Sequence, residues 1–326
     1  MSASPIFILG CHRSGTSLLR SLLDGHPDLN VVPIESHYFE HSGHRIAYPL
    51  RFQEKDGSRG PSGFLRSAEL EFSLHQDPFN YRKDTDLRKG FDHERFRERM
   101  EEGGREDDGP DRMIRFFQAL FEAAGGELRK EGRWVEKSVE HFEFLPLLKH
   151  WFPHARFLHV VRDPYANLVS LRNFRSRNGN FPFLPPLIDT LRWHRYHLFR
   201  AEEWVEGHLR LHYEELVQAP ERTMSWVAEQ LGLTFYPSLL TPSYLGTEWK
   251  GNRVSGEPLE GLSRERIDAW RDEISPVEIR LLNRGLGRMI EDSGYERTPS
   301  PKGFWKKQKG ELFKTYLSNR YYKNYL

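Results

Sequence analysis

The chain has one cysteine, five methionines and no long apolar run. A single thiol, Cys11, excludes an internal disulfide and any metal site built from several cysteines. No apolar stretch approaches the roughly 20 residues that a membrane-spanning helix needs. The first residues carry neither the basic segment nor the apolar segment of a secretory signal. We therefore expect a cytoplasmic protein without a transmembrane segment.

An excess of positive charge is also missing. The 326 residues include 48 Lys+Arg against 47 Asp+Glu, a formal net charge of +1. Proteins that bind nucleic acid generally need a surplus of basic groups to neutralise phosphates, so we expect no nucleic-acid partner. Aromatic residues make up 13% of the chain and hydrophobic residues 37%, which indicates a folded protein with a sizeable core.

Short apolar runs alternate with helical patterns along the chain. The runs 6–9, 156–161 and 208–213 are typical of strands in a parallel sheet, and helices are expected over 111–130 and 141–151, among others. This alternation predicts an α/β fold with helices on both faces of a central parallel sheet. There is no internal repeat and no convincing linker. We expect one domain over residues 1–326.

Two regions differ from this pattern. Residues 40–112 are irregular, with dense charge over 92–112, and are expected to form an insertion or a lid. Residues 299–326 are basic with interleaved aromatic residues. This C-terminal extension is expected to pack on the body or on a second subunit, as in a homo-oligomer. Contact with an acidic substrate or an anionic surface is the alternative.

The segment Gly10–Ser17 joins the first predicted strand to a helix. Backbone N–H groups at a helix N-terminus form an anion site, which glycine allows the chain to wrap closely. The phosphate loop of kinases and NTPases has a lysine directly after its second glycine, but Thr16 follows Gly15 here. A nucleoside-triphosphate enzyme is therefore disfavoured. The cation of this loop is instead Arg13.

Four segments of the chain form a recognisable set. In chain order they are 13–17 (RSGTS), 134–138 (WVEKS), 157–164 (FLHVVRDP) with Ser170, and 213–217 (YEELV) with Pro220. Together they resemble the motifs of sulfotransferases that use 3′-phosphoadenosine-5′-phosphosulfate (PAPS), in particular the bacterial and the glycan and tyrosylprotein branches. The resemblance spans roughly residues 5–275 and implies a P-loop-like three-layer α/β/α fold with PAPS as co-substrate and no metal.

The resemblance also implies roles for individual residues. Glu35 is expected to be the base on the acceptor, with His37 as its rival, while Arg13 and Lys137 stabilise negative charge. Lys137 could instead pair with Glu136 or Glu140, and Arg162 with Asp163. The segment from Trp249 is expected to fold over the nucleotide. The expected PAPS-binding residues are Arg13, Ser14, Gly15, Thr16, Ser17, Arg162, Ser170, Tyr213, Lys250 and Arg253.

Other functions stay open at this stage. His37, His41 and His44 suggest a metal site, but no matching ligand cluster is evident elsewhere in the sequence, so no metal is predicted. A P-loop kinase or NTPase and a non-catalytic PAPS-binding protein are the alternative functions. The acceptor is expected to be a hydroxyl or an amine, preferably of a saccharide or glycolipid. Basic and aromatic residues of segment 174–190, with Arg172 before it, favour that choice.

Overall fold

The computed structural model describes residues 4–42, 91–102, 109–177, 184–249, 251, 262, 264 and 267–300. Most of the predicted insertion and nearly all of the C-terminal extension lie outside these residues. The predictions of a lid and of a contact with a second subunit therefore remain predictions.

A five-stranded parallel sheet forms the centre of the molecule, with strand order β2-β3-β1-β4-β5. Strand β1 pairs with β4 along its whole length, from Ile6 opposite Arg156 to Gly10 opposite Val160. The predicted fold class, a P-loop-like α/β/α arrangement around a parallel sheet, is confirmed. The strands are β1 (Ile6–Gly10), β2 (Leu29–Val31), β3 (Arg133–Glu136), β4 (Arg156–Val161) and β5 (His208–His212).

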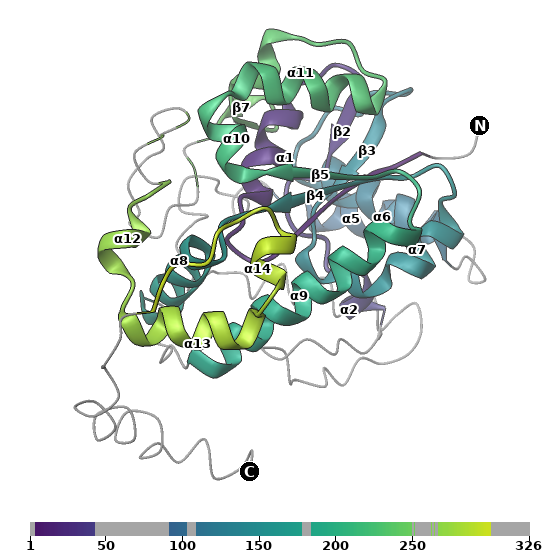
Figure 1. Ribbon diagram of the computed structural model, residues 1–326. Helices are drawn as coiled ribbons and strands as arrows, with labels where there is room; N and C mark the ends of the chain where they lie inside the picture. Colours follow the sequence, from purple (N-terminus) through teal and green to yellow (C-terminus); the bar gives the residue numbers. More distant parts are fainter. Residues whose placement is uncertain are drawn as a thin grey trace.

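Alternate residues of each strand pack on opposite faces of the sheet. Ile6 and Ile8 contact one core cluster and Phe7 and Leu9 the other. The first face is covered by α1 (Thr16–Asp24), α10 (Tyr213–Gln218) and α11 (Pro220–Leu231), which lie together in Figure 1. The second face is covered by α5 (His93–Glu101), α6 (Pro110–Ala123), η1 (Val139–Phe144), α7 (Leu145–Trp151) and part of α9 (Leu184–Trp204).

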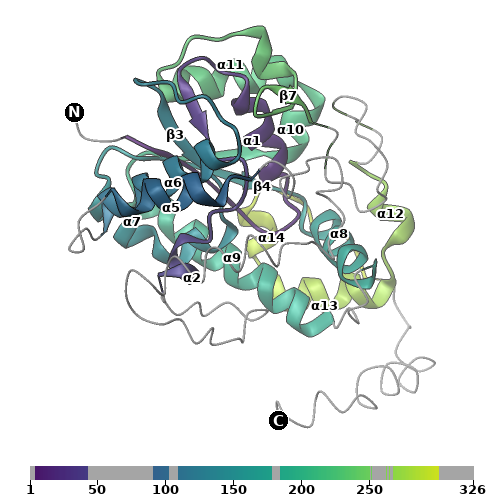
Figure 2. The same ribbon diagram turned by 180° about the vertical axis from the view of Figure 1, so that it is seen from behind.

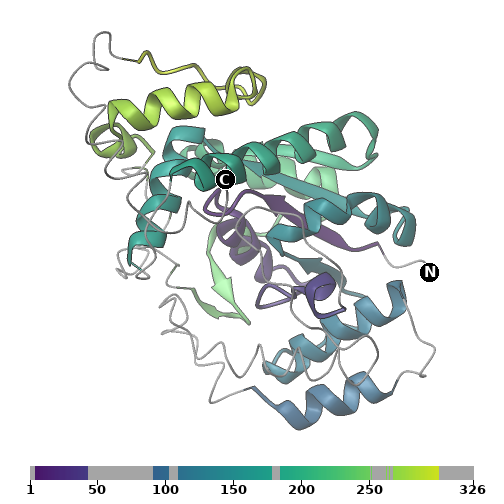
Figure 3. The same ribbon diagram turned by 90° about the horizontal axis from the view of Figure 1, so that it is seen from below.

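The third core cluster lies between α8 (Pro164–Arg177), the first part of α9 and the last three helices of the described chain. Figure 3 shows α13 stacked on the outer side of this layer. These elements are α12 (Trp270–Glu273), α13 (Pro276–Leu286) and α14 (Met289–Asp292). The remaining short elements are α2 (Tyr38–His41), η2 (Pro237–Leu240), β6 (Ser243–Tyr244) and β7 (Thr247–Glu248).

Local signals fix several helix ends. The side chain of Asp163 accepts hydrogen bonds from the backbone of Tyr165 and Ala166, at 2.8 and 3.4 Å, and so caps α8. Helix α11 ends at Leu231 and is capped by Gly232, which has a left-handed φ of 67°. Helix α13 begins with a capping box between Ser275 and Glu278.

Two predicted helices differ from the structure. The helix predicted over 111–130 ends at Ala123, because the Gly125–Gly126 pair breaks the regular pattern. The helix predicted over 141–151 begins as 3₁₀ turns and becomes α-helical only at Leu145. In the charged region, α5 lies along α6, as Figure 2 shows, and buries Phe96 and Met100. This part of the region packs on the core.

Candidate active site

Each of the five strands is followed by a predicted site residue or loop, and all of these lie at the same edge of the sheet. Glu35 follows β2, Lys137 follows β3 and Arg162 follows β4. The loop at 11–15 follows β1, and Tyr213 follows β5. Because the strands are parallel, their carboxyl ends share one edge, where ligands of open α/β sheets bind. The predicted residues therefore lie at one edge of the sheet, and their roles stay predictions.

The loop after β1 is shaped by its glycines. Gly15 precedes α1 with φ 105° and ψ 8°, and a Cβ there would collide with the ring of Tyr213. A Cβ on Gly10 would lie 2.8 Å from the carbonyl oxygen of Val160 on β4. Cys11 is buried, and burial raises the pKa of its thiol to about 12. The two glycines thus let the loop pass close to β4 and to Tyr213 before α1 begins.

Arg162 joins this loop to the end of β4. Its Nη1 donates a 2.8 Å hydrogen bond to the carbonyl oxygen of Arg13, and its guanidinium lies 4.6 Å from the centre of the Tyr213 ring. Arg13 in turn donates from Nε to Oγ of Ser170, at 3.4 Å. Asn167 donates a 2.6 Å hydrogen bond to the carbonyl oxygen of His12. The structure therefore brings Arg13, Arg162, Ser170 and Tyr213 together.

Three buried polar atoms around this group have no hydrogen-bond partner within the described part of the chain. They are Ser14 Oγ, Arg162 Nε and Asn167 Oδ1. Buried polar groups without partners are costly and are usually satisfied by water or a ligand. Among the ion pairs of the described residues none uses Arg162, and Asp163 caps α8 instead. A hydroxyl and a guanidinium N–H suit an anion with several oxygens.

Lys137 and Glu35 form an ion pair in which Nζ of the lysine donates to Oε1 of the glutamate. The alternative pairing of Lys137 with Glu136 does not occur. Glu136 is fully buried and accepts hydrogen bonds from the Ser138 hydroxyl and the Ser36 backbone. Burial would raise the pKa of Glu35, but Lys137 and then His37 lower it to about 2. Glu35 is therefore ionised.

His37 stands beside Glu35 in a left-handed conformation, with φ 48°. Its Nε2 lies 3.7 Å from Oε2 of Glu35. On the other side of the ring, Nδ1 lies 2.5 Å from Glu40 and 3.5 Å from Glu140. The rival base is thus a direct neighbour of Glu35. Of the three histidines considered for a metal, His37 clusters with Glu35 and Glu140, and His44 lies outside the described residues.

The remaining predicted residues are not part of this group of contacts. Trp249 is buried in the core cluster that also contains residues of α1, and its place over the nucleotide stays a prediction. Lys250 and Arg253 lie outside the described residues. Arg172 binds Glu278 through Nη1 at 2.6 and 2.8 Å and is not free to meet an acidic acceptor. Thr16 is buried and Ser17 half-buried at the start of α1.

The sequence did not reveal two residues that hold the backbone of the site through hydrogen bonds to its carbonyl oxygens. Asn167 holds the loop carbonyl described above. Arg195, buried on α9, donates a 2.6 Å hydrogen bond to the carbonyl oxygen of Arg162 and a second one to Ser293 Oγ. An arginine and an asparagine inside helical patterns gave no sequence signal, because their partners are backbone carbonyls of distant segments.

Together the fold and the loop define a class: α/β proteins with a glycine-containing strand–loop–helix junction that lacks the lysine of nucleoside-triphosphate enzymes. A family model described as the sulfotransferase family matches residues 5–237. The chain belongs to the sulfotransferase family.

Individual relatives are distant. The chain is 22% identical to protein-tyrosine sulfotransferase 1 of Danio rerio, over 92% of this chain and 74% of that protein. It is 26% identical to carbohydrate sulfotransferase 2 of Mus musculus, over 59% of this chain and only 43% of the relative. Within the described residues, none of the helices combines the length and the apolar character needed to cross a membrane.

Solved structures show the same fold. The sulfotransferase domain of the curacin biosynthetic pathway aligns with a TM-score of 0.58 at 19% identity, over 91% of this chain and 99% of that domain. The sulfotransferase domain of the Synechococcus PCC 7002 olefin synthase aligns with a TM-score of 0.54 at 22% identity, over 91% of this chain and 97% of that domain.

Proposed function

We propose that the protein transfers the sulfuryl group of PAPS to a hydroxyl or amine acceptor. The observation that carries this proposal is the shared edge at which the loop 11–15, Arg162 and the Glu35–Lys137 pair meet. The loop N–H groups, Arg13 and Ser14 would hold the 5′-phosphosulfate. Arg162 and Ser170 would hold the 3′-phosphate, beside the ring of Tyr213. The unpartnered Ser14 Oγ and Arg162 Nε support this assignment. Lys250 and Arg253 remain candidates for the same phosphate.

In the proposed reaction the acceptor oxygen or nitrogen forms a bond to sulfur while the bond from sulfur to the bridging phosphate oxygen breaks. The acceptor proton passes to the carboxylate of Glu35, and adenosine 3′,5′-bisphosphate leaves with the electron pair on its phosphate. Arg13, Lys137 and the loop N–H groups would stabilise the charge that spreads over the sulfuryl and leaving oxygens. A carboxylate is an effective base when it is held within hydrogen-bond reach of the proton.

For the acceptor we propose a saccharide or glycolipid. The match to a carbohydrate sulfotransferase supports this choice, whereas the match to a protein-tyrosine sulfotransferase supports a peptide. A screen of both acceptor classes with radiolabelled PAPS separates them. Transfer to tyrosyl peptides and not to sugars would contradict our choice of acceptor and leave the reaction type intact.

Calorimetric titration with adenosine 3′,5′-bisphosphate tests the nucleotide. We expect binding that 5′-AMP does not match and that Arg162→Ala weakens sharply, because one phosphate loses its guanidinium. ADP with Mg²⁺ is the comparison ligand. A preference for it would indicate a kinase or NTPase instead.

The variant Glu35→Gln tests the base. We expect a loss of kcat of about 10²–10⁴-fold with unchanged affinity for adenosine 3′,5′-bisphosphate, as for removal of a general base. A wild-type protein that binds this nucleotide but transfers no sulfuryl group to any acceptor would indicate a non-catalytic PAPS-binding protein. Full activity in Glu35→Gln with loss of activity in His37→Ala would make His37 the base.

A further inference from the structure

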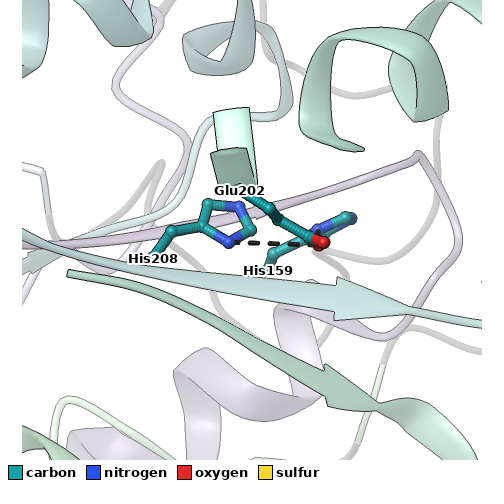
Figure 4. A group of neighbouring side chains, drawn as sticks. All are labelled: His159, Glu202 and His208. Atoms are coloured by element: carbon teal, nitrogen blue, oxygen red, sulfur yellow. Dashed lines mark hydrogen bonds and ion pairs between the residues drawn. The ribbon is translucent and has the colours of Figure 1, made fainter. Parts of the chain in front are cut away.

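Two histidines and a glutamate meet on the sheet face under α9, away from the candidate active site. His159 lies on β4, His208 at the start of β5, and Glu202 on α9 (Figure 4). The side chains of both histidines are almost fully buried, whereas that of Glu202 is 21% exposed. The anion site, by contrast, lies beyond the other end of β5, at Tyr213.

One potential ligand atom of each residue lies close to those of the other two. Nδ1 of His159 lies 3.3 Å from Oε1 of Glu202, and Nδ1 of His208 lies 4.0 Å from the same oxygen. One ligand atom from each residue lies within 4.8 Å of the other two. Ligands at bonds of about 2.1 Å around a tetrahedral zinc ion are roughly 3.4 Å apart. Small side-chain rotations would therefore bring the three atoms to coordination distance.

The donor set of the cluster also suits a cation. It consists of two imidazole nitrogens and one carboxylate oxygen, a combination that first-row transition metals favour.

Arg210 is the neighbouring group that fixes the carboxylate. Its Nε donates to Oε1 of Glu202 at 2.7 Å, and its Nη2 donates to Oε2. The arginine therefore contacts both carboxylate oxygens, and a cation would share Oε1 with Nε through the second lone pair of that oxygen. Such outer partners commonly orient metal ligands. Arg210 is also the positive charge that opposes a cation here, so replacing it should change the affinity.

We propose that His159, Glu202 and His208 form a binding site for a divalent transition cation, with zinc as the best match. Three protein ligands leave a coordination position for water on the side of the partly exposed Glu202. Bound there, the ion would join α9 to β4 and β5 and so stabilise the layer that carries Arg195. The proposal is independent of the sulfuryl-transfer reaction.

Titration of chelator-treated protein with Co²⁺ and Zn²⁺ tests the site. We expect one Co²⁺ ion to bind per protein molecule and to show the visible absorption of a cobalt ion with low coordination number. Zn²⁺ should displace it. His208→Ala and His159→Ala should each weaken binding at least tenfold. Because the chain has 15 histidines, the control is His212→Ala, on the same strand and hydrogen-bonded to Tyr295 outside the cluster. His212→Ala should bind as the wild type does.

Two readouts keep the test decisive if a variant folds poorly. X-ray absorption of the wild-type zinc complex should show two imidazole ligands, whereas the cluster of Glu35, His37 and Glu140 offers one. Zinc should also raise the unfolding temperature of the wild type but not of Glu202→Gln. Absence of Co²⁺ binding at millimolar concentration, or equal binding in His208→Ala and His212→Ala, would overturn the proposal. Binding of adenosine 3′,5′-bisphosphate should be the same with and without zinc.

Discussion

Lys137 donates a hydrogen bond from Nζ to Oε1 of Glu35, so the proposed base and one proposed stabilising cation neutralise each other. The lysine keeps the pKa of Glu35 at about 2 although burial opposes this. A carboxylate of such low pKa is a weak base. In the proposed reaction Glu35 becomes a stronger base when the sulfuryl oxygens attract Lys137, so that proton removal depends on the bound donor.

Replacing Lys137 separates its two effects. We expect Lys137→Met to raise the pKa of Glu35 above about 2, because burial then acts without the ammonium. The variant should nevertheless lose about 10²–10³-fold in kcat, since a donor to the developing charge is lost. Carboxyl NMR and steady-state kinetics measure the two effects. Lys149→Met, which removes contacts to Pro153 and Glu206, is the control and should leave both quantities unchanged.

The Glu35–Lys137 pair also makes the free energy of unfolding depend on pH. The folded-state pKa of Glu35, about 2, lies below its ordinary value of 4.5, so the pair stabilises the folded protein fully above pH 4.5. This contribution is lost as the pH falls from 4.5 toward 2. Urea unfolding of wild type and Lys137→Met should therefore differ most near pH 6 and converge near pH 2. A difference independent of pH would contradict the pairing.

Gly15 should tolerate no side chain. Its φ of 105° is unfavourable for other residues, and a Cβ would meet the Tyr213 ring. We expect Gly15→Ala to weaken binding of adenosine 3′,5′-bisphosphate at least tenfold and to destabilise the protein by more than about 1 kcal/mol. Gly232→Ala is the matched control, because φ is also positive there but nothing lies within 4 Å of the added Cβ. Gly232→Ala should lose stability but keep the nucleotide affinity of the wild type. Equal affinity of both variants for adenosine 3′,5′-bisphosphate would contradict the close contact between Gly15 and the Tyr213 ring.

Phe96 tests whether α5 belongs to the core. Its side chain is fully buried between α5 and α6. Phe96→Ala should lower the free energy of unfolding by about 3–5 kcal/mol, as for other buried phenylalanines. Glu98→Ala, exposed on the same helix, should change it by less than about 0.5 kcal/mol. Equal effects in chemical denaturation would mean that α5 is detached in solution.

The sequence was sufficient for features that depend on neighbours along the chain. The loop at 11–15 and the Arg162–Asp163–Pro164 segment each follow a short apolar strand, and parallel pairing then brings them to one edge. It was insufficient where a side chain meets a distant partner. Arg195 reaches the Arg162 carbonyl from α9, a helix that the sequence did not predict, and His159 meets Glu202 only because α9 crosses the sheet. The partner of Lys137 was uncertain for the same reason.

The two hydrogen bonds that Arg162 and Asn167 make to loop carbonyls have a consequence for nucleotide choice. They fasten the loop after β1 to the residues around the start of α8. The separation between the two proposed phosphate positions is then set by the protein before any ligand arrives. A nucleotide with its second phosphate on the 2′ oxygen would present a different separation and fit this arrangement less well. The protein would thus distinguish phosphate isomers by the distance between their two phosphates. That distance is set by hydrogen bonds to uncharged backbone carbonyls.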